Sequence, residues 1–83
     1  MPHTHSLPIP LSRISIGERV VLVQLNMPKT SANRLLSLGF TPGVEISITQ
    51  NYGRGPMVVY VRGARVALGR SEASDILVKQ ENP

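Results

Sequence analysis

The sequence predicts a small, mainly β domain of about five short strands that close into a barrel. Two observations carry this prediction. Short segments rich in Val and Ile, some with strict apolar–polar alternation, are separated by tight turns that contain Gly and Pro. The chain has 83 residues, which allows one domain, and 41% of them are hydrophobic, which excludes a disordered protein. Closure into a barrel would remove exposed strand edges.

The first half of the chain predicts a strand followed by a short helix. Residues 19–25 are apolar on both faces, which is typical of a buried strand. Thr30 or Ser31 is then expected to cap a helix that runs over residues 32–38. Gly39 is well placed as the left-handed residue that ends this helix. Pro42 and Gly43 predict a type II turn that leads directly into the next strand.

The second half predicts further strands joined by tight connections. Strands are expected at residues 44–50, 57–62, 65–68 and 76–79. A hairpin loop at 51–56 joins the first two, and Gly63 with Ala64 is expected to make the next reversal. Before the last strand, Ser71 is expected to cap a single helical turn over residues 71–75.

Both ends of the chain are expected to lie outside the domain, which would span residues 11–79. Residues 1–10 contain three prolines and predict a flexible tail, whereas residues 80–83 predict a frayed end. The tail lacks the Lys, Arg and apolar run of a signal peptide, and no stretch approaches the length of a membrane-spanning helix. We therefore expect a soluble cytoplasmic protein.

Four sequence runs, at residues 16–20, 34–44, 55–63 and 66–78, follow one another in a distinctive order. The most specific run has the pattern R-L-L-x-L-G-x-x-P-G. Taken together in this order, the runs resemble the FeoA family of small accessory proteins of bacterial ferrous iron transport. We interpret the motif residues as structural, with the three leucines anchoring the helix; they are Arg34, Leu35, Leu36, Leu38, Gly39, Pro42, Gly43, Ala67, Leu68, Ala73 and Ile76.

The resemblance implies an SH3-like barrel with a short helix inserted after the first strand and a helical turn before the last. It also implies a non-enzymatic protein that acts on the cytoplasmic GTPase region of the FeoB membrane transporter, and so lies at the inner membrane through that partner. The same domain type occurs at the C-terminus of DtxR-like metal-dependent repressors. A stand-alone regulatory domain of that kind is therefore an alternative.

Catalytic, cofactor and metal sites are not expected. Both histidines, His3 and His5, lie in the tail, so no Ser-His-Asp arrangement is available, and the five carboxylates are scattered. Without Cys there is no disulfide and no thiolate metal site. The tail histidines would suit Ni²⁺ or Cu²⁺. The resemblance implies transition-metal binding only at the level of the family.

Charge leaves two kinds of partner to compare. Nine Lys and Arg against five Asp and Glu give a net charge of +4, mostly from arginines. A small basic barrel that binds nucleic acid is an alternative, although only two tyrosines are available to stack on bases. We instead predict a protein partner with an acidic or polar surface. The predicted contact residues are Tyr52, Arg54, Met57, Tyr60, Arg62 and Arg65, and an exposed strand edge would permit weak self-association.

Overall fold

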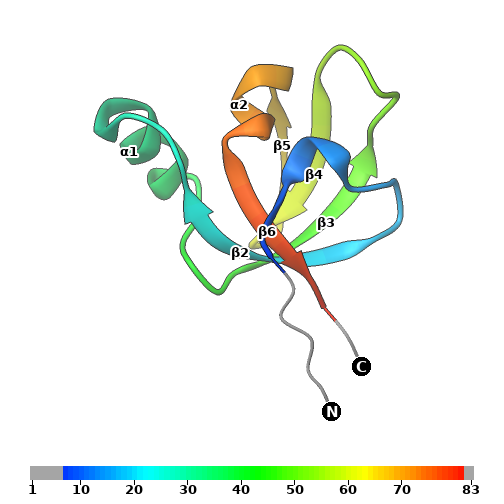
Figure 1. Ribbon diagram of the computed structural model, residues 1–83, viewed down its shortest axis with the longest axis horizontal. Coiled ribbons are helices and arrows are strands. Elements are labelled where there is room, and N and C mark those ends of the chain that lie inside the picture. The colour runs from blue at the N-terminus through cyan, green and yellow to red at the C-terminus, as the bar shows by residue number, and fades with distance from the viewer. Residues whose placement is uncertain (1–6, 82–83) are drawn as a thin grey trace.

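A computed structural model describes residues 7–81, which form an antiparallel sheet with short helical segments (Figure 1). In chain order the elements are β1 (Ile9–Pro10), the 3₁₀ helix η1 (Leu11–Arg13), β2 (Arg19–Leu25), α1 (Lys29–Ser37), β3 (Glu45–Gln50), β4 (Met57–Val61), β5 (Ala64–Leu68), α2 (Arg70–Ser74) and β6 (Ile76–Gln80). The predicted mainly β class is confirmed. A short helix after β2 and a helical turn before the last strand are also found, although α1 begins three residues and α2 one residue before the predicted start.

The strands form one sheet in the order β1-β6-β2-β3-β4-β5, with every neighbouring pair antiparallel. Within residues 7–81 no ladder joins β1 to β5, so the curled sheet has an open side. The helices that follow these two strands, η1 and α2, contact each other. One such contact joins the hydroxyls of Ser12 and Ser74 at 3.2 Å. Helix packing therefore bridges the open side at the place where η1 meets α2.

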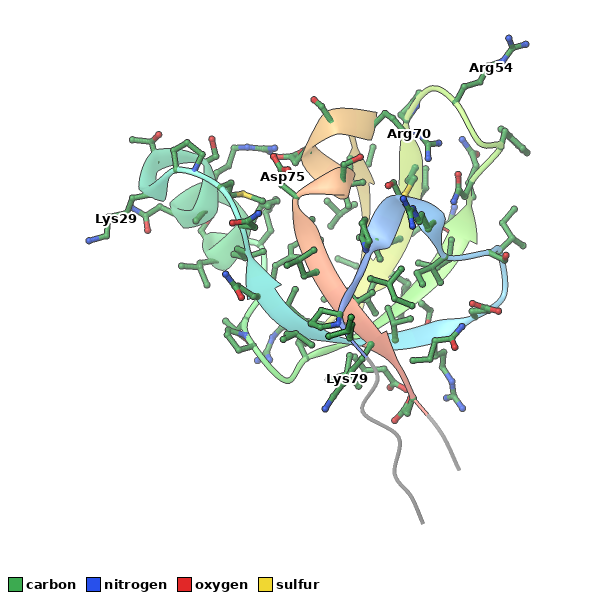
Figure 2. All side chains as sticks on the ribbon, viewed as in Figure 1. Lys29, Arg54, Arg70, Asp75 and Lys79 are labelled. Carbon is green, nitrogen blue, oxygen red and sulfur yellow. The ribbon has the colours of Figure 1, made fainter. Side chains whose placement is uncertain are left out.

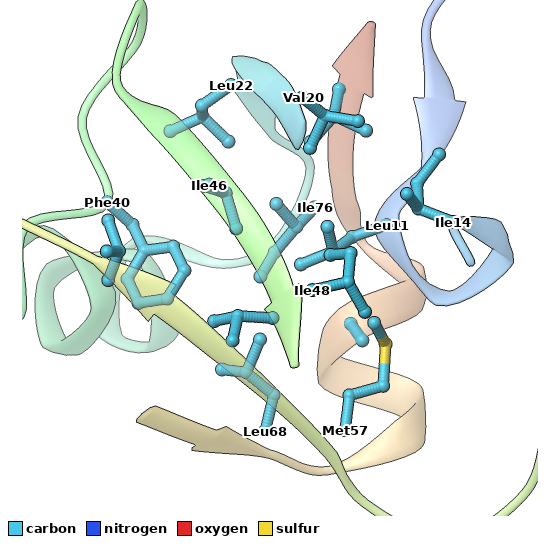
Figure 3. Close-up of a cluster of buried hydrophobic side chains, with 14 of the residues drawn as sticks. Leu11, Ile14, Val20, Leu22, Phe40, Ile46, Ile48, Met57, Leu68 and Ile76 are labelled. Carbon is cyan, nitrogen blue, oxygen red and sulfur yellow. The ribbon is translucent and has the colours of Figure 1, made fainter. Parts of the chain in front are cut away.

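The core lies inside the curl of the sheet (Figure 3). On β3 and β4 alternate residues point inward, as the period of two requires, and Ile46 and Val59 have no exposed surface. Phe40, which follows α1, is also fully buried. The buried hydrophobic residues are Leu11, Ile14, Val20, Leu22, Leu35, Phe40, Ile46, Ile48, Met57, Val59, Val61, Leu68, Ala73, Ile76 and Val78.

The strand that the sequence did not predict is β1. Ile9 pairs with Val78 and Pro10 with Leu77, so residues of the expected tail extend the sheet. Pro10 has no amide to donate, and proline is tolerated at a sheet edge for that reason. At the other end, Gln80 pairs with Val20, so β6 extends one residue past the expected strand.

Both predicted helix caps are wrong. The helix α1 begins at Lys29 directly after Pro28, and no side chain caps it. The helix α2 begins at Arg70 after Gly69, again without a capping side chain, so Ser71 lies inside the helix. Pro28 and Gly69 occupy the N-cap positions with ψ 153° and 155°, and neither residue has a side chain that could accept a hydrogen bond from the first turn.

The end of α1 agrees with the sequence at Gly39 but not at all three leucines. Gly39 has φ +103°, and the amides of Gly39 and Phe40 donate to the carbonyls of Leu36 and Leu35, which is the Schellman pattern. Leu35 is fully buried. Leu36 and Leu38, in contrast, are 40% and 41% exposed, so of the predicted leucine anchors only Leu35 is buried in the core.

Two turns complete the sheet. At the first, Gly43 has φ +91° and the Val44 amide donates to Thr41, as expected for the Pro-Gly turn. Between β4 and β5 the turn residues are Arg62 (φ 50°) and Gly63 (φ 84°). The predicted turn at Gly63 and Ala64 is therefore wrong by one residue. Arginine is uncommon in the left-handed region, so the sequence gives no signal that Arg62 belongs to the turn.

Arg62 also contacts the end of α1. A Cβ atom on Gly39 would lie 2.5 Å from Cδ of Arg62 and 3.2 Å from its Cγ. The aliphatic part of Arg62 therefore covers the glycine that ends the helix. This contact joins the β4–β5 turn to α1, and it requires both a positive φ and the absence of a side chain at position 39.

We predict that Gly39→Ala lowers the free energy of unfolding by about 1–3 kcal/mol, because alanine is strained at positive φ and its Cβ meets Arg62. Urea unfolding followed by circular dichroism measures the change. In an Arg62→Ala background the same substitution should lose less, because only the backbone strain remains. An equal loss in both backgrounds would contradict the Arg62 contact.

Candidate functional site

The structure separates the residues predicted to contact a partner. Met57 is fully buried in the core and has no surface to offer. Tyr52 and Arg54 lie in the loop between β3 and β4, where Tyr52 is 74% exposed and Arg54 extends away from the domain (Figure 2). Tyr60 and Arg65 lie on β4 and β5. The predicted set therefore forms two separate surfaces, with Met57 in neither.

The first surface consists of Tyr60, Arg62 and Arg65, and we call it the β4–β5 surface. Tyr60 is 46% exposed and pairs directly with Arg65 across the two strands. On its other side Tyr60 pairs with Ser47 of β3. Arg62 occupies the turn that joins β4 to β5. An aromatic ring and the guanidinium-bearing residue opposite it therefore lie at the end of the sheet next to the turn that carries Arg62.

The arginines of the β4–β5 surface have no carboxylate partner in the described part of the chain. Ion pairs among residues 7–81 join Arg19 to Glu45 at 3.6 Å and Arg34 to Glu72. Neither pair involves Arg62 or Arg65. The positive charge of this surface is therefore free to interact with a negatively charged ligand or partner.

The second surface, Tyr52 with Arg54, is carried by a loop whose base is tightly held. Asn51 opens the loop, and its Oδ1 accepts a hydrogen bond from the Gly53 amide at 3.0 Å. Its Nδ2 donates to the carbonyls of Ser12 and Ile14, at 3.1 and 2.8 Å. A single side chain therefore shapes the loop and also attaches it to η1.

Arg70 at the start of α2 completes this arrangement (Figure 2). Its guanidinium donates to the carbonyl of Gly55 at 3.1 Å, to the carbonyl of Ser12 at 3.1 Å and to Oδ1 of Asn51 at 2.9 Å. Three segments distant in sequence meet at this one group. We refer to Arg70 and Asn51, with the backbone atoms they bind, as the Arg70 network.

The sequence prediction missed the Arg70 network because it counted Arg70 among the scattered charges. A weak signal was available. A cation in the first turn of a helix is disfavoured by the helix dipole, so an arginine at that position suggests that its side chain serves another purpose. The position of Asn51 at the start of a loop is a second signal, since asparagine commonly bonds the backbone two residues on.

A cleft of about 200 Å³ lies between the two helices. It is lined by Met27, Pro28, Ser31, Ser71, Glu72 and Asp75. Beside it the guanidinium of Arg34 pairs with the carboxylate of Glu72, which joins α1 to α2. Glu72 is thus neutralised by a partner, whereas Asp75, the other carboxylate of the cleft, takes part in neither ion pair described within residues 7–81.

A second cleft, of about 260 Å³, lies where β2 meets the end of β6. Its lining residues are Glu18, Arg19, Gln80 and Glu81. Gln80 donates to the Glu18 carboxylate at 3.1 Å. A hydrogen bond with Glu45 is the largest cause that raises the pKa of Glu81, followed by desolvation and by repulsion from Glu45, whereas Arg19 lowers this pKa. The carboxyl group of Glu81 is therefore protonated more easily because the carboxyl group of Glu45 lies beside it.

Metal ligands are not grouped in the described structure. Within residues 7–81 no three His, Cys, Asp or Glu side chains are placed to hold an ion. His3 and His5, whose imidazoles would suit Ni²⁺ or Cu²⁺ although no metal site is expected from the sequence, lie outside the described residues. As for a membrane, no helix between residues 7 and 81 has the length and apolar character needed to cross one.

Comparison with known proteins gives a consistent set of relatives. The family model described as "FeoA domain" matches residues 9–80. The chain is 29% identical over 70 residues to the "Putative Fe(2+) transport protein A" of Methanocaldococcus jannaschii, and the match covers 84% of each sequence.

Solved structures confirm the fold. The crystal structure of an iron uptake regulatory protein (FeoA) has a TM-score of 0.84 and 28% identity, over 90% of this chain and 100% of that one. FeoA of Stenotrophomonas maltophilia in complex with zinc, described as a prokaryotic SH3 domain protein, has a TM-score of 0.72 and 29% identity, over 93% and 98%. A manganese-dependent transcriptional repressor, 17% identical, shares the fold over 42% of its length with a TM-score of 0.81.

We predict that Arg70→Lys destabilises the domain by about 1–3 kcal/mol, because an ammonium group cannot reach the three acceptors of the Arg70 network together. Thermal unfolding measures the loss, which corresponds to a fall in Tm of several degrees. Arg65→Lys, at an exposed position with no described hydrogen bond, is the control and should leave Tm nearly unchanged. Equal effects of the two substitutions would contradict the network's role.

The raised pKa of Glu81 predicts a pH-dependent effect of Glu81→Gln. A carboxyl group with a raised pKa in the folded state favours folding at low pH, and this contribution is lost as the pH rises through the folded-state pKa. Glu81→Gln should therefore be slightly more stable than the unaltered chain at pH 7, and equal to it near pH 3. A Tm difference that is independent of pH would contradict the pairing with Glu45.

Proposed function

Because the chain belongs to the FeoA domain family, we propose that it is a non-enzymatic accessory protein of ferrous iron uptake that binds the cytoplasmic GTPase region of the FeoB membrane transporter. The names of its relatives support the iron-transport role, since they include an Fe(2+) transport protein A and an iron uptake regulatory protein. In this role the protein works in the cytoplasm and reaches the inner membrane through its partner.

One observation carries the choice of contact surface. Tyr60 is exposed beside Arg65, and neither Arg65 nor Arg62 has a carboxylate partner within residues 7–81. Tyr and Arg are enriched at protein interfaces, because a ring and a guanidinium group each combine apolar area with hydrogen bonding. An acidic region of the partner would supply the missing carboxylates.

The loop residues Tyr52 and Arg54 are proposed as a second contact, at the opposite end of the β3–β4 hairpin. The Arg70 network holds the base of their loop, so less conformational entropy would be lost when a partner binds. Met57 is not part of either contact because it is buried. The two contacts are far enough apart to be tested independently.

Calorimetric titration with the purified cytoplasmic region of a FeoB-type transporter tests this proposal. We expect the unaltered protein to bind, and the double substitution Tyr60→Ala with Arg65→Glu to weaken binding by at least about tenfold. Tyr52→Ala with Arg54→Glu measures the second contact in the same way. Lys79→Glu, on the exposed part of β6, makes the same charge change at a control position and should have a much smaller effect.

Three results would contradict the proposal. If the unaltered protein does not bind the transporter region, the partner is wrong. If Lys79→Glu weakens binding as much as the β4–β5 substitutions, the interaction follows net charge and not this surface. If single-stranded oligonucleotides bind with steep salt dependence and the transporter region does not bind, the nucleic-acid alternative is favoured.

A further inference from the structure

The strand β5 lies at one edge of the sheet. It pairs with β4 along its whole length, from Met57 with Leu68 to Val61 with Ala64, and it is last in the strand order (Figure 1). Within residues 7–81 no other strand pairs with it. Its second edge is therefore open, and a strand edge of this kind is able to accept another strand.

The register fixes which backbone groups point to the open edge. Val61 and Ala64 flank the two-residue turn at Arg62 and Gly63, and residues in that position exchange hydrogen bonds in such a hairpin. Along β5 the bonding groups alternate in direction. Val66 and Leu68 therefore bond to β4, whereas the amide and carbonyl groups of Arg65 and Ala67 point outward.

Positively charged side chains near this edge determine which kind of added strand binds best. Arg65 is exposed on β5 itself, and Arg62 is exposed in the turn that precedes it. Neither has a carboxylate partner among residues 7–81. Directly opposed charges on neighbouring strands attract when opposite and repel when alike. An added strand is therefore favoured if its side chain opposite Arg65 is a carboxylate.

The same charge disfavours a second copy of this chain as the occupant. When two β5 strands pair antiparallel along their whole length, Arg65 faces Ala67 of the other copy, and in a register shifted by two residues it faces Arg65. In both of these registers the two arginines come within about 5–8 Å of each other. The opposite shift, which keeps the arginines apart, pairs only residues 66–68. Arg65 thus protects the edge against self-pairing and at the same time favours an acidic strand.

We propose that β5 binds an extended acidic segment of a partner protein as an added strand, held by the outward backbone groups of Arg65 and Ala67 and by the guanidinium group of Arg65. This inference deepens the proposed function and rests on it for the identity of the partner. The strand addition itself is a property of this chain's own edge and is tested separately.

The first test uses a synthetic peptide as the probe: acetyl-Thr-Glu-Val-Glu-Val-Glu-Thr-amide, with the matching peptide that has Lys in place of each Glu as control. We follow the backbone amide signals of the isotope-labelled protein by NMR. The acidic peptide should shift the amides of Arg65 and Ala67 most strongly, and the basic peptide should shift them little. Equal shifts by both peptides, or shifts centred on another strand, would overturn the proposal.

Two substitutions at position 67 isolate the backbone bond. Ala67→Pro removes an outward amide but no bond to β4, so the domain should remain folded, which circular dichroism verifies. Ala67→Ser keeps the amide and is the matched control. We expect Ala67→Pro to bind the acidic peptide at least about tenfold more weakly than Ala67→Ser. Arg65→Glu, which leaves the backbone intact, should weaken binding similarly even if the proline variant does not fold.

The same variants with the FeoB-type cytoplasmic region distinguish the two proposals. If that region binds Ala67→Pro as well as Ala67→Ser, strand addition is overturned and the proposed function stands. If the acidic peptide binds at β5 and the transporter region does not bind, the strand site stands and the proposed partner fails. Dimers seen by light scattering that Ala67→Pro abolishes would identify a second copy as the occupant and overturn the proposal.

Discussion

The guanidinium group of Arg70 holds together the side of the domain where the sheet is not closed by strands. It binds the carbonyls of Ser12 and Gly55 and the side chain of Asn51. Those acceptors belong to η1 after β1 and to the loop before β4, while Arg70 itself follows β5. No strand ladder joins β1 to β5 within residues 7–81, and carbonyl groups beside this gap need other donors. The guanidinium group of Arg70, which is planar and has five N–H donors, provides three of these hydrogen bonds. The shape of the curled sheet and the base of the exposed loop both depend on this contact.

Because no ladder joins β1 to β5 within residues 7–81, β5 has an edge that a partner strand can use. A barrel closed by a strand ladder would leave no edge, whereas in the described residues 7–81 the gap is bridged by the contact of η1 with α2 and no strand pairs with the outer edge of β5. At the far end of β5, Arg62 covers Gly39 and so fixes the turn that precedes the strand. The edge is thus held at both ends by contacts that involve neither its outward amides nor the Arg65 side chain. These groups remain available to a partner.

Local patterns predicted most of this fold from the sequence. The alternation on β3 and β4, the Gly39 helix end and the Pro42–Gly43 turn each depend on a few neighbouring residues, and all three are found in the structure. Other features depend on distant parts of the chain. Ile9 and Pro10 form a strand only because β6 lies beside them. Leu38 stays partly exposed, although its spacing of three residues from the buried Leu35 suggests that it also faces the core. Methionine is common at protein interfaces, but Met57 belongs to the set of alternate β4 residues whose side chains point into the core.

The candidate site also depends on contacts that local sequence patterns do not give. Tyr60 and Arg65 become neighbours through the register of β4 and β5, and the turn that sets this register uses an arginine in the left-handed region. The most direct test is cross-saturation NMR on the labelled protein bound to a FeoB-type cytoplasmic region. The account predicts the strongest loss of amide signal at Tyr60, Arg62, Arg65 and Ala67. Loss centred on α2 or β6, with the β4–β5 surface unaffected, would contradict it.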